Sequence, residues 1–336
     1  MKVYEIRAFG LDGLKLTERP QPQPGPFEVL LKVRTASLSY RDLMMLKGSY
    51  NPRMQMPRVP LSDAAGEVAA VGPGVSRVKV GQRVAGIFMQ KWLAGELTEA
   101  GARSALAGSI DGVLAEYVVL HEDGVVAVPE HLSDEEAATL PCAAVTAWHG
   151  LITEGQATAG DSVLVQGTGG VSLFALQFAR LVGARVVITS SSDDKLRRAR
   201  EMGAADTINY KATPEWGERV RELTAGRGVD HVVEVGGAGT LGQSLKAVRL
   251  GGHISLIGVL SGGTGQVNPL PVLMKGVRVQ GIFVGSRAMF EAMNRAIALH
   301  RLRPVVDRVF GFTEAVEAYR YLESAAHFGK IVLRVS

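Results

Sequence analysis

Three glycines near the middle of the chain follow a run of residues suited to a buried strand. Val163–Gln166 supplies the strand, and the residues that come next include Gly167, Gly169 and Gly170. Apolar residues then recur at helical spacing from Val171. A strand, a glycine turn and a helix in this order can hold the pyrophosphate of a dinucleotide on free backbone N–H groups at the helix start. The alternative is an ordinary turn between a strand and a helix.

A cluster of serines stands where the ribose of such a dinucleotide would be recognised. Proteins that bind NAD present an acidic residue to the ribose 2′-OH about 20 residues after the glycines. This chain has Ser190, Ser191 and Ser192 there, with Lys195 one turn later. Hydroxyl groups and an ammonium suit a 2′-phosphate, so the sequence predicts NADPH as the cofactor. The alternative role of the serines is to cap the following helix, and both roles can hold at once.

The elements around the glycine turn alternate between helix and strand from about residue 141. This alternation favours a parallel, doubly wound sheet with helices on both faces. The predicted strands are Val163–Gln166, Arg185–Thr189, Thr207–Tyr210, Val229–Val235, Gly252–Ile257 and Val277–Val284. The predicted helices after the first are Asp193–Met202, Glu215–Thr224, Leu241–Val248 and 286–300.

Residues 1–125 show a different pattern of short strands at regular turn spacing, which is typical of a small barrel. The strands expected there are Glu28–Ala36, Ala64–Val71 and Gln82–Ala85. The segment 90–112 interrupts them and is either a lid or an insertion. The closing segment Lys330–Val335 has a strand pattern, and we expect it to rejoin this first domain.

Composition narrows the class of protein. The chain has 336 residues, enough for two domains, and 46% of them are hydrophobic. Lys and Arg exceed Asp and Glu by 37 to 33 without a basic run, which argues against a nucleic-acid groove and favours an anionic ligand. A single cysteine, Cys142, allows no internal disulfide and favours a cytoplasmic setting. We found neither a signal-peptide pattern nor a membrane span, so no membrane partner is expected.

Several motifs together resemble the medium-chain dehydrogenase/reductase superfamily, and within it the zinc-lacking quinone oxidoreductase-like branch. They are ASLSYRD at 36–42, AAGEVAAVGPGV at 64–75, KVGQRVAG at 79–86, LPCAAVTAWHGL at 140–151, VQGTGGVS at 165–172 and HFGKIVLRV at 327–335. The resemblance implies an α/β fold with a GroES-like β-barrel domain for the substrate and a Rossmann domain for NADP, with a cleft between them. We place the first domain at 1–125 and 287–336 and the second at 126–286. Where the family has a third glycine, this chain has Ser172, and we expect a slight shift of the helix.

The resemblance also bears on metal chemistry. Zinc-dependent members hold a catalytic zinc with a cysteine, a histidine and a second cysteine, and these positions fall on Ser39, Ser62 and Cys142, with Asp63 beside the second. One thiolate does not make a zinc site, which needs about three protein ligands. We therefore expect no metal, and we expect Cys142 to be a small buried apolar residue.

The expected reaction follows from that absence. Oxidising a simple alcohol requires a stabilised alkoxide, which zinc supplies as a Lewis acid. Hydrogen-bond donors suffice for an activated acceptor, so we expect hydride transfer from NADPH to a small hydrophobic quinone or α,β-unsaturated carbonyl. One alternative is a broad alcohol or carbonyl dehydrogenase that works without metal. Another is an NADPH-binding structural or sensor protein with little turnover.

The resemblance assigns candidate site residues. Tyr40 or Ser39 is the expected oxyanion donor or proton source, although Tyr40 could equally pack in the interdomain cleft. Lys330 is expected either to reach a phosphate or to face solvent. The expected cofactor-binding residues are Thr146, Gly167, Gly169, Gly170, Val171, Ser190, Ser191, Lys195, Tyr210, Gly258, Val259, Phe283 and Gly285.

Assembly is indicated by one segment. Val277–Val284 reads VRVQGIFV, a strand pattern that would lie at the edge of the predicted sheet. An exposed strand edge can pair with a second copy of itself. This possibility, together with the habit of the family, predicts a homodimer.

Overall fold

The computed structural model describes all residues from Met1 to Ser336, and the chain divides into two compact units. Unit 1 comprises 1–145 and 285–336, and unit 2 comprises 146–284. The second boundary lies within a few residues of the expected 286/287 position, but the first lies well beyond the expected 125/126 position. The physical reason is that β7 (Val125–Ala127) pairs with β5 (Arg83–Gly86) and so extends the sheet of unit 1, and that Arg83 of β5 also holds Asp134 in the segment that follows.

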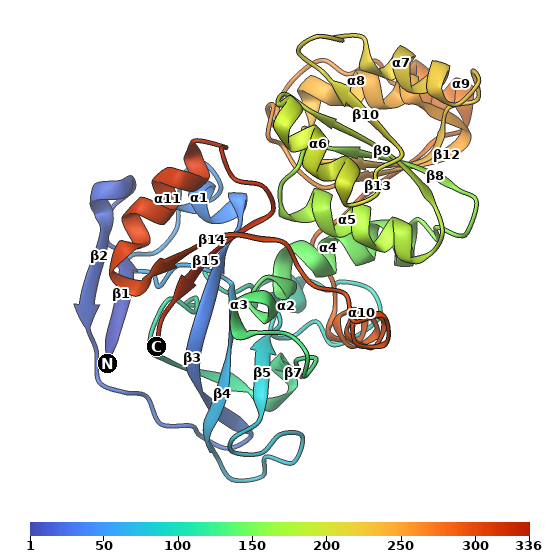
Figure 1. The fold of residues 1–336 in the computed structure, drawn as a ribbon. Coiled ribbons are helices and arrows are strands. Elements are labelled where there is room, and N and C mark those ends of the chain that lie inside the picture. The colour runs from blue at the N-terminus through green and yellow to red at the C-terminus, as the bar shows by residue number, and fades with distance from the viewer. The chain divides into compact units, whose positions relative to one another are not determined.

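Unit 2 is built on a six-stranded, entirely parallel sheet with the strand order β10-β9-β8-β11-β12-β13. Every residue of β8 and β11 is buried, as expected for central strands that are covered on both faces. The chain runs outward from β8 to β10 and then returns to β11, so the connecting helices lie on both faces of the sheet (Figure 1). The strands are β8 (Ser162–Gln166), β9 (Arg185–Ser190), β10 (Asp206–Asn209), β11 (Val229–Glu234), β12 (Val248–Leu256) and β13 (Arg278–Gly281). The predicted doubly wound parallel sheet is confirmed.

The helices of unit 2 follow the predicted rhythm. In α5, residues at helical spacing such as Phe174 and Phe178 are fully buried, and Phe178 meets Trp148 edge-on at 5.3 Å between ring centroids. By contrast, α9 buries none of its residues. The helices are α5 (Gly170–Leu181), α6 (Asp193–Glu201), α7 (Trp216–Leu223), α8 (Ala238–Ala247) and α9 (Leu270–Lys275).

Unit 1 contains a seven-stranded sheet in which the C-terminal strand joins strands from the beginning of the chain. β15 (Lys330–Arg334) pairs parallel with β14 (Val306–Gly311) and antiparallel with β3 (Glu28–Leu38), as Figure 1 shows for the red and blue ends of the chain. The prediction that 330–335 rejoins the first domain is therefore confirmed. The other strands of this sheet are β4 (Asp63–Val71), β5, β6 (Tyr117–His121) and β7. β1 (Lys2–Ile6) and β2 (Leu14–Glu18) form a separate antiparallel pair.

Short helices close unit 1 around one large hydrophobic core. Tyr319 of α11 is completely buried there, together with Leu31 and Leu46. The α-helices are α1 (Tyr40–Leu46), α2 (Glu99–Ala102), α3 (Asp134–Ala137), α10 (Arg287–His300) and α11 (Ala315–Glu323). Single 3-10 turns lie at η1 (Leu11–Gly13), η2 (Glu122–Gly124) and η5 (Phe312–Glu314).

The segment 90–112 is packed against unit 1 rather than left loose. Trp92 is 5% exposed, and its indole N–H donates to the carbonyl of Gly95. The carbonyls of Trp92 and Leu93 accept the backbone N–H groups of Arg287 and Ala288 at the start of α10. These bonds anchor the first part of this segment to a helix that is distant in sequence.

The chain passes from unit 1 to unit 2 within one helical stretch of mixed geometry. π-helical turns at η3 (Leu140–Ala144) and η4 (His149–Glu154) flank α4 (Val145–Trp148). Within unit 2, Nδ1 of His149 lies 2.7 Å from the carbonyl oxygen of Val284, the last residue before the chain returns to unit 1. This contact joins the two ends of unit 2.

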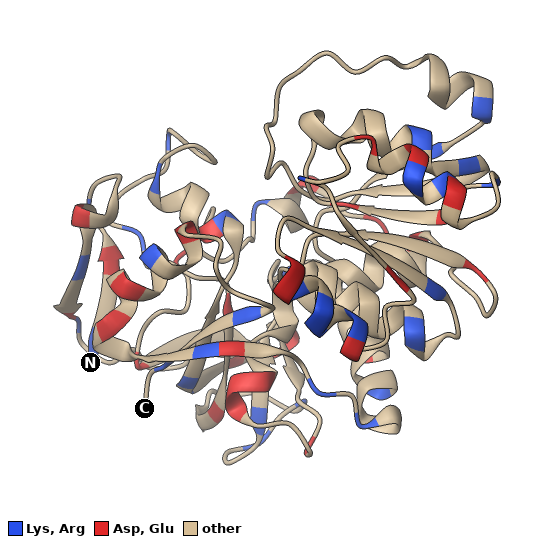
Figure 2. Cartoon of the chain, turned by 45° about the horizontal axis from the view of Figure 1, so that its top comes forward, with Lys and Arg blue, Asp and Glu red and all other residues tan.

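Charged side chains are distributed over both units. Figure 2 shows basic and acidic residues interspersed along the ribbon, in keeping with the small positive net charge of +4. None of the helices combines the length and the apolar character needed to cross a membrane.

Candidate functional site

A buried lysine forms the centre of a polar cluster in unit 1. The Nζ atom of Lys330 donates to the carbonyl oxygen of Leu38 at 2.6 Å and to Oγ of Ser39 at 2.9 Å. The residue is only 3% exposed. The antiparallel register of β15 and β3 pairs Ile331 with Leu38, so that the next residues outward, Lys330 and Ser39, face each other. The expectation that Lys330 faces solvent is wrong, because its ammonium is buried and bonded to Leu38 and Ser39.

Two buried carboxyl groups accompany this ammonium. Asp63 is fully buried, with one oxygen 3.7 Å from Lys330 Nζ and the other accepting the hydroxyl of Ser62 at 2.7 Å. Burial raises the pKa of Asp63 to about 6, while the charge of Lys330 opposes that rise. Asp42 accepts the backbone N–H of Ser39 at 2.8 Å, and burial raises the pKa of this carboxyl group as well. The cluster therefore holds charge in a region with little water.

Cys142 belongs to the same cluster. Burial raises the pKa of its thiol to about 12, and Asp63 adds to that rise while Lys330 opposes it. Cys142 therefore remains a neutral thiol at neutral pH. The residue as a whole is of intermediate exposure, so the small buried apolar residue that we expected is only partly buried.

These residues do not fit a zinc site. Two of the three positions at which zinc-dependent members carry ligands are the serines Ser39 and Ser62, and hydroxyl groups fall outside the usual ligand set of Cys, His and carboxylate. No group of three or more His, Cys, Asp or Glu side chains is placed to hold a metal ion. In addition, the ammonium of Lys330 would repel a cation placed beside Ser39 and Asp63.

The two candidate catalytic hydroxyl groups differ in their surroundings. Ser39 is the N-cap residue of α1 and is half-buried beside Lys330. Tyr40 is the first residue of α1 and is 43% exposed within the structure. Next to them, the guanidinium of Arg41 lies over the rings of Phe88 and Tyr50, at 4.7 and 5.5 Å from their centroids. Of the two hydroxyl groups, only that of Ser39 is engaged by a buried charge.

The glycine turn of unit 2 has the features of an anion cradle. Gly167 adopts a φ of +70°, and a Cβ added at Gly169 would meet no protein atom within 4 Å. Gly169 is the N-cap residue of α5 and has no side chain that could accept a hydrogen bond. The N–H groups of the first turn, including those of Gly170 and Val171, are therefore left without a side-chain partner. Open space at a helix start with free N–H groups fits a dinucleotide pyrophosphate.

Ser172, which replaces the third glycine of the family pattern, is accommodated in the first turn of α5. It is 2% exposed, and its hydroxyl donates to the carbonyl oxygen of Gln166 at 2.6 Å. The side chain thus ties the helix to the last residue of β8 and faces away from the open space beside Gly169.

Sequence reasoning missed a buried network beneath this turn. The carboxylate of Glu234 accepts hydrogen bonds from Gln166 Nε2 at 2.7 Å and from the backbone N–H of Gly236 at 2.7 Å. Thr240 and Ser244 of α8 also donate to it. Because Gln166 ends β8 and Glu234 ends β11, the network holds two loops at the carboxyl ends of neighbouring strands. The only signal in the sequence was a polar residue at the end of each otherwise apolar strand.

The predicted ribose site is partly assembled. The register pairs Asn209 of β10 with Ser190 of β9, and the backbone N–H of Tyr210 donates to the carbonyl of Ser190. The ends of these strands thus bring Ser190 and Tyr210 together. Ser192 caps α6 by accepting the backbone N–H of Lys195 at 3.4 Å, so the capping alternative is correct for this one serine.

The remaining predicted cofactor residues lie in different settings. Gly258 follows β12, and a Cβ there would come within 2.4 Å of the carbonyl oxygen of Val235, so this position requires glycine. Val259 and Phe283 are both 40% exposed, whereas Thr146 is 3% exposed. Gly285 is the first residue of the second segment of unit 1, so the predicted set divides between the two units.

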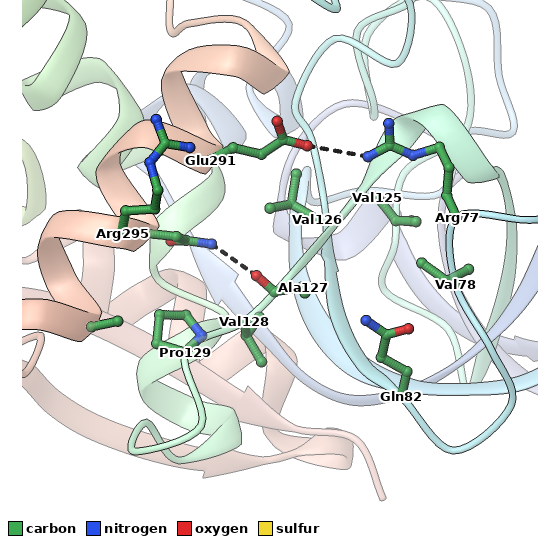
Figure 3. Close-up of a pocket in the computed structure, with 12 residues that line it drawn as sticks. Arg77, Val78, Gln82, Val125, Val126, Ala127, Val128, Pro129, Glu291 and Arg295 are labelled. Atoms are coloured by element: carbon green, nitrogen blue, oxygen red, sulfur yellow. Dashed lines mark hydrogen bonds and ion pairs between the residues drawn. The ribbon is translucent and has the colours of Figure 1, made fainter.

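A groove elsewhere in unit 1 contains none of the predicted residues. It encloses about 430 Å³ between β7 and α10, with an apolar floor that includes Val125 and Val128 (Figure 3). At its rim, Arg77 donates to Glu291 at 3.1 Å. The charged groups at the rim are therefore partly neutralised by each other, and we assign no role in catalysis to this groove.

Comparisons with known proteins agree with this architecture. Residues 25–130 match the family described as alcohol dehydrogenase GroES-like domain, and residues 170–298 match the family described as zinc-binding dehydrogenase. A zinc-type alcohol dehydrogenase-like protein of Schizosaccharomyces pombe is 46% identical over 97% of this chain and 96% of its own length. An acryloyl-coenzyme A reductase of Metallosphaera sedula is 30% identical over 96% of both chains.

Solved structures show the same fold. A putative alcohol dehydrogenase from Sinorhizobium meliloti has a TM-score of 0.93 and 43% identity, covering 99% of this chain and 98% of its own. An NAD-dependent alcohol dehydrogenase has a TM-score of 0.91 and 36% identity, with full coverage of both chains. A mycobacterial protein in complex with NADPH has a TM-score of 0.85 and 28% identity, again with full coverage of both chains. With its GroES-like unit, its parallel Rossmann-type unit and these end-to-end similarities, the chain belongs to the medium-chain, zinc-type alcohol dehydrogenase family of NAD(P)-dependent oxidoreductases.

Proposed function

We propose that this protein is a zinc-independent oxidoreductase that transfers hydride from NADPH to a quinone or an α,β-unsaturated carbonyl. The observation that carries this proposal is the cluster at the family's metal position, where the ammonium of Lys330 donates to Ser39 and no set of zinc ligands is present. The name of the M. sedula relative, an acryloyl-coenzyme A reductase, supports this substrate class because acryloyl groups are α,β-unsaturated carbonyls.

The chemistry suits hydroxyl donors. The nicotinamide, when bound, supplies the hydride. The hydride forms a bond to the β-carbon of the substrate, and the electron pair of the C=C double bond moves toward the carbonyl oxygen. A hydroxyl donor such as that of Ser39 then stabilises the negative oxygen, and the α-carbon takes up a proton from water. The sum is a saturated carbonyl compound and an oxidised cofactor, which needs no further oxidant or reductant.

NADPH is the proposed form of the cofactor. Four residues at or after the ends of β9 and β10 carry hydroxyl or ammonium groups, which suit a 2′-phosphate. They are Ser190, Ser191, Lys195 and Tyr210. The remaining cofactor contacts are proposed for the glycine turn, for Thr146 and for the segments around Gly258 and Phe283. Among the similar structures, the mycobacterial one was solved with NADPH, whereas another is named an NAD-dependent enzyme.

A metal-independent alcohol or carbonyl dehydrogenase is the second candidate. The alcohol dehydrogenase part of this candidate is favoured by the names of two relatives, the zinc-type alcohol dehydrogenase-like protein of S. pombe and the putative alcohol dehydrogenase of S. meliloti. A cofactor-binding protein with little turnover is a third possibility.

A substrate panel separates these functions. The oxidation of NADPH is followed at 340 nm with quinones, enones and saturated ketones, and the reverse reaction is measured with simple alcohols and NADP⁺. The first proposal predicts turnover with quinones or enones that chelators do not reduce. Activity on alcohols and saturated ketones alone would select the second function, and tight NADPH binding without any turnover would select the third.

Elemental analysis tests the zinc-independent part of the proposal separately. The purified chain is dialysed against zinc and then against buffer, and its metal content is measured by mass spectrometry. We expect far less than one zinc per chain. A stoichiometric, tightly held zinc ion would contradict the proposal even if enones were reduced.

We also propose a homodimer formed through unit 2. β13 is the edge strand of the parallel sheet, and the preceding helix α9 leaves Leu273 and Met274 71% or more exposed. Apolar exposure next to an unpaired strand edge is typical of a surface that another chain covers. Light scattering of the wild type and of Leu273→Lys tests this proposal, and a monomeric wild type would contradict it.

A further inference from the structure

We propose that Lys330 is a positioning residue that holds Ser39 as the hydrogen-bond donor to the oxygen of the substrate carbonyl. This inference rests on the proposed function for its choice of substrate. It concerns one contact, between the C-terminal strand β15 and the cap of α1, to which nothing in the sequence had assigned a role.

The direction of this hydrogen bond is settled by the chemistry of the two groups. An ammonium has only donors, so Lys330 donates and Ser39 Oγ accepts. The hydrogen of the serine hydroxyl must then point away from Lys330. Because Ser39 is half-buried rather than fully buried, part of the residue remains accessible to a ligand. The lysine thus leaves Ser39 with a donor that is not used by the ammonium.

The charge of the ammonium strengthens that donor. A hydroxyl that accepts a hydrogen bond from a cation becomes a better donor, because hydrogen bonds in a chain polarise one another in a region of low dielectric constant. Lys330 is 3% exposed and the neighbouring Asp63 is fully buried, so little water screens the charge of the ammonium at Ser39. The positive charge that a metal ion supplies in zinc enzymes is replaced here by an ammonium that acts through a hydroxyl group.

A purely structural role for the lysine explains less of the geometry. The bond from Lys330 to the carbonyl of Leu38, at 2.6 Å, would by itself tie β15 to β3. Ser37 makes a link of that structural kind, because its hydroxyl donates to the carbonyl of Ile331 at 3.2 Å and the residue is completely buried. Ser37 is therefore a matched control, since it is a second serine of β3 that contacts β15 without touching the ammonium.

The test is a double-mutant cycle with Ser39→Ala, Lys330→Met and the combination of both. With an accepted enone, each single variant is expected to lower kcat about a hundredfold with little change in KM, which is the typical effect of losing one oxyanion donor. The double variant is expected to be no slower than Ser39→Ala, because the lysine acts through the serine. Lys330→Arg is expected to recover part of kcat, and Ser37→Ala is expected to keep it.

A second measurement needs no turnover. 4-Nitrophenolate mimics the enolate oxygen, and its absorbance near 400 nm reports binding to the NADP⁺ complex. We expect 4-nitrophenolate to bind about tenfold more weakly to Ser39→Ala and to Lys330→Met. A loss of this size corresponds to one hydrogen bond to a charged group. The double variant should show no further loss of affinity. If Lys330→Met fails to fold because it leaves Asp63 unpaired, Lys330→Met/Asp63→Asn removes both charges.

The outcomes separate the two proposals. The positioning role would be overturned if the losses of kcat in the two single variants multiplied in the double variant. It would also be overturned if Ser39→Ala kept the kcat of the wild type. Either result would leave the proposed enone reductase activity intact. A wild type that reduces no member of the panel would overturn the proposed function, and the phenolate cycle would then still decide the role of Lys330.

Discussion

Lys330 Nζ and Ser39 Oγ lie 2.9 Å apart although 291 positions separate the two residues in the chain. The contact exists because β15 returns from the C-terminus to pair antiparallel with β3. It places a buried ammonium beside Ser39, the position at which the resemblance to zinc-dependent members puts a metal ligand. This juxtaposition is the basis of the proposed zinc-independent chemistry.

Gly169→Ala is expected to weaken the binding of NADPH without destabilising the fold. The added Cβ meets no protein atom within 4 Å, so it would point into the space proposed for the pyrophosphate. We expect the dissociation constant, measured by fluorescence quenching, to rise at least several-fold while the melting temperature stays close to that of the wild type. Gly242→Ala on α8, which also meets nothing within 4 Å, is the matched control. Equal NADPH affinity in both variants would argue against a pyrophosphate beside Gly169.

Lys195→Ala is expected to lower the affinity for NADPH and to leave that for NADH unchanged. The ammonium is proposed to pair with the 2′-phosphate, which NADH lacks, and one charge-assisted hydrogen bond contributes about 1.5–3 kcal/mol. Titrations of both cofactors by calorimetry measure the difference. Lys211→Ala, an exposed lysine next to Tyr210, serves as the control. A parallel loss of NADH affinity in Lys195→Ala would show that the lysine is not selective for the phosphate.

Asp230→Asn is expected to destabilise unit 2 by about 1.5–3 kcal/mol, the usual contribution of hydrogen bonds to a charged group, because the two arginines that lose their partner are themselves partly exposed. The side chain is 2% exposed, and it accepts hydrogen bonds from Arg227 and Arg249, both at 2.6 Å, and from Ser162. Urea unfolding at pH 7 measures the change in free energy. The pair of Asp194 with Arg197 is largely exposed, so Asp194→Asn should cost less than about 1 kcal/mol.

The same carboxylate predicts a pH dependence. Burial by itself raises the pKa of Asp230, but the two arginines and Ser162 outweigh that effect and lower the pKa below its ordinary value of 3.8. A lowered pKa in the folded state means that the stabilisation is present above pH 4 and is lost as the pH falls further. The stability difference between wild type and Asp230→Asn should therefore shrink in acid. A difference that stays constant down to pH 2 would contradict this account.

His253→Leu is expected to make the stability of unit 2 less sensitive to mild acid. Burial, followed by the charges of Arg278 and His231, lowers the pKa of His253 to about 4 from 6.5. Neither ring nitrogen has a hydrogen-bond partner, and the residue is 5% exposed. Above pH 6.5 the imidazole of His253 is neutral in both the folded and the unfolded state. Between pH 6.5 and 4 only the unfolded state takes up the proton, which lowers the free energy of unfolding by up to about 3 kcal/mol.

The measurement for His253 is urea unfolding at pH 7 and at pH 5. The wild type should lose stability between the two, and His253→Leu should lose less. His300→Leu, at the exposed end of α10, controls for the general effect of removing a histidine. Equal losses in His253→Leu and in the wild type would rule out His253 as the source of the acid sensitivity.

Local patterns in the sequence were sufficient for most elements of unit 2. The apolar run of β8, the glycines after it and the helical spacing of α5 are each complete within about 20 residues, so the strand–turn–helix arrangement could be predicted directly. The helical expectation for Asp193–Met202 was also close, because Ser192 and Gly203 mark its ends. The expected strand Val277–Val284 was too long, since β13 covers only Arg278–Gly281 at the edge of the sheet.

The first boundary between the units depends on contacts that no local pattern shows. The turns around residue 125 suggested an end, yet β7 and α3 continue unit 1 by contacting a strand that lies about 40 to 50 residues earlier in the chain. Strand pairing between distant segments is decided by the summed burial of both partners, and this cannot be read from either segment alone.

The sequence by itself determined the strand, glycine turn and helix at the start of unit 2, the presence of two units and the family, because these depend on spacing within short segments and on motifs that occur in order. Only the tertiary structure decided the place of Lys330. Its neighbours in sequence form a strand, and a lysine on a strand is ordinarily exposed. The antiparallel register of β15 and β3 turns this side chain inward to Ser39 and Asp63, since hydrogen bonds and an opposite charge there offset the cost of removing an ammonium from water.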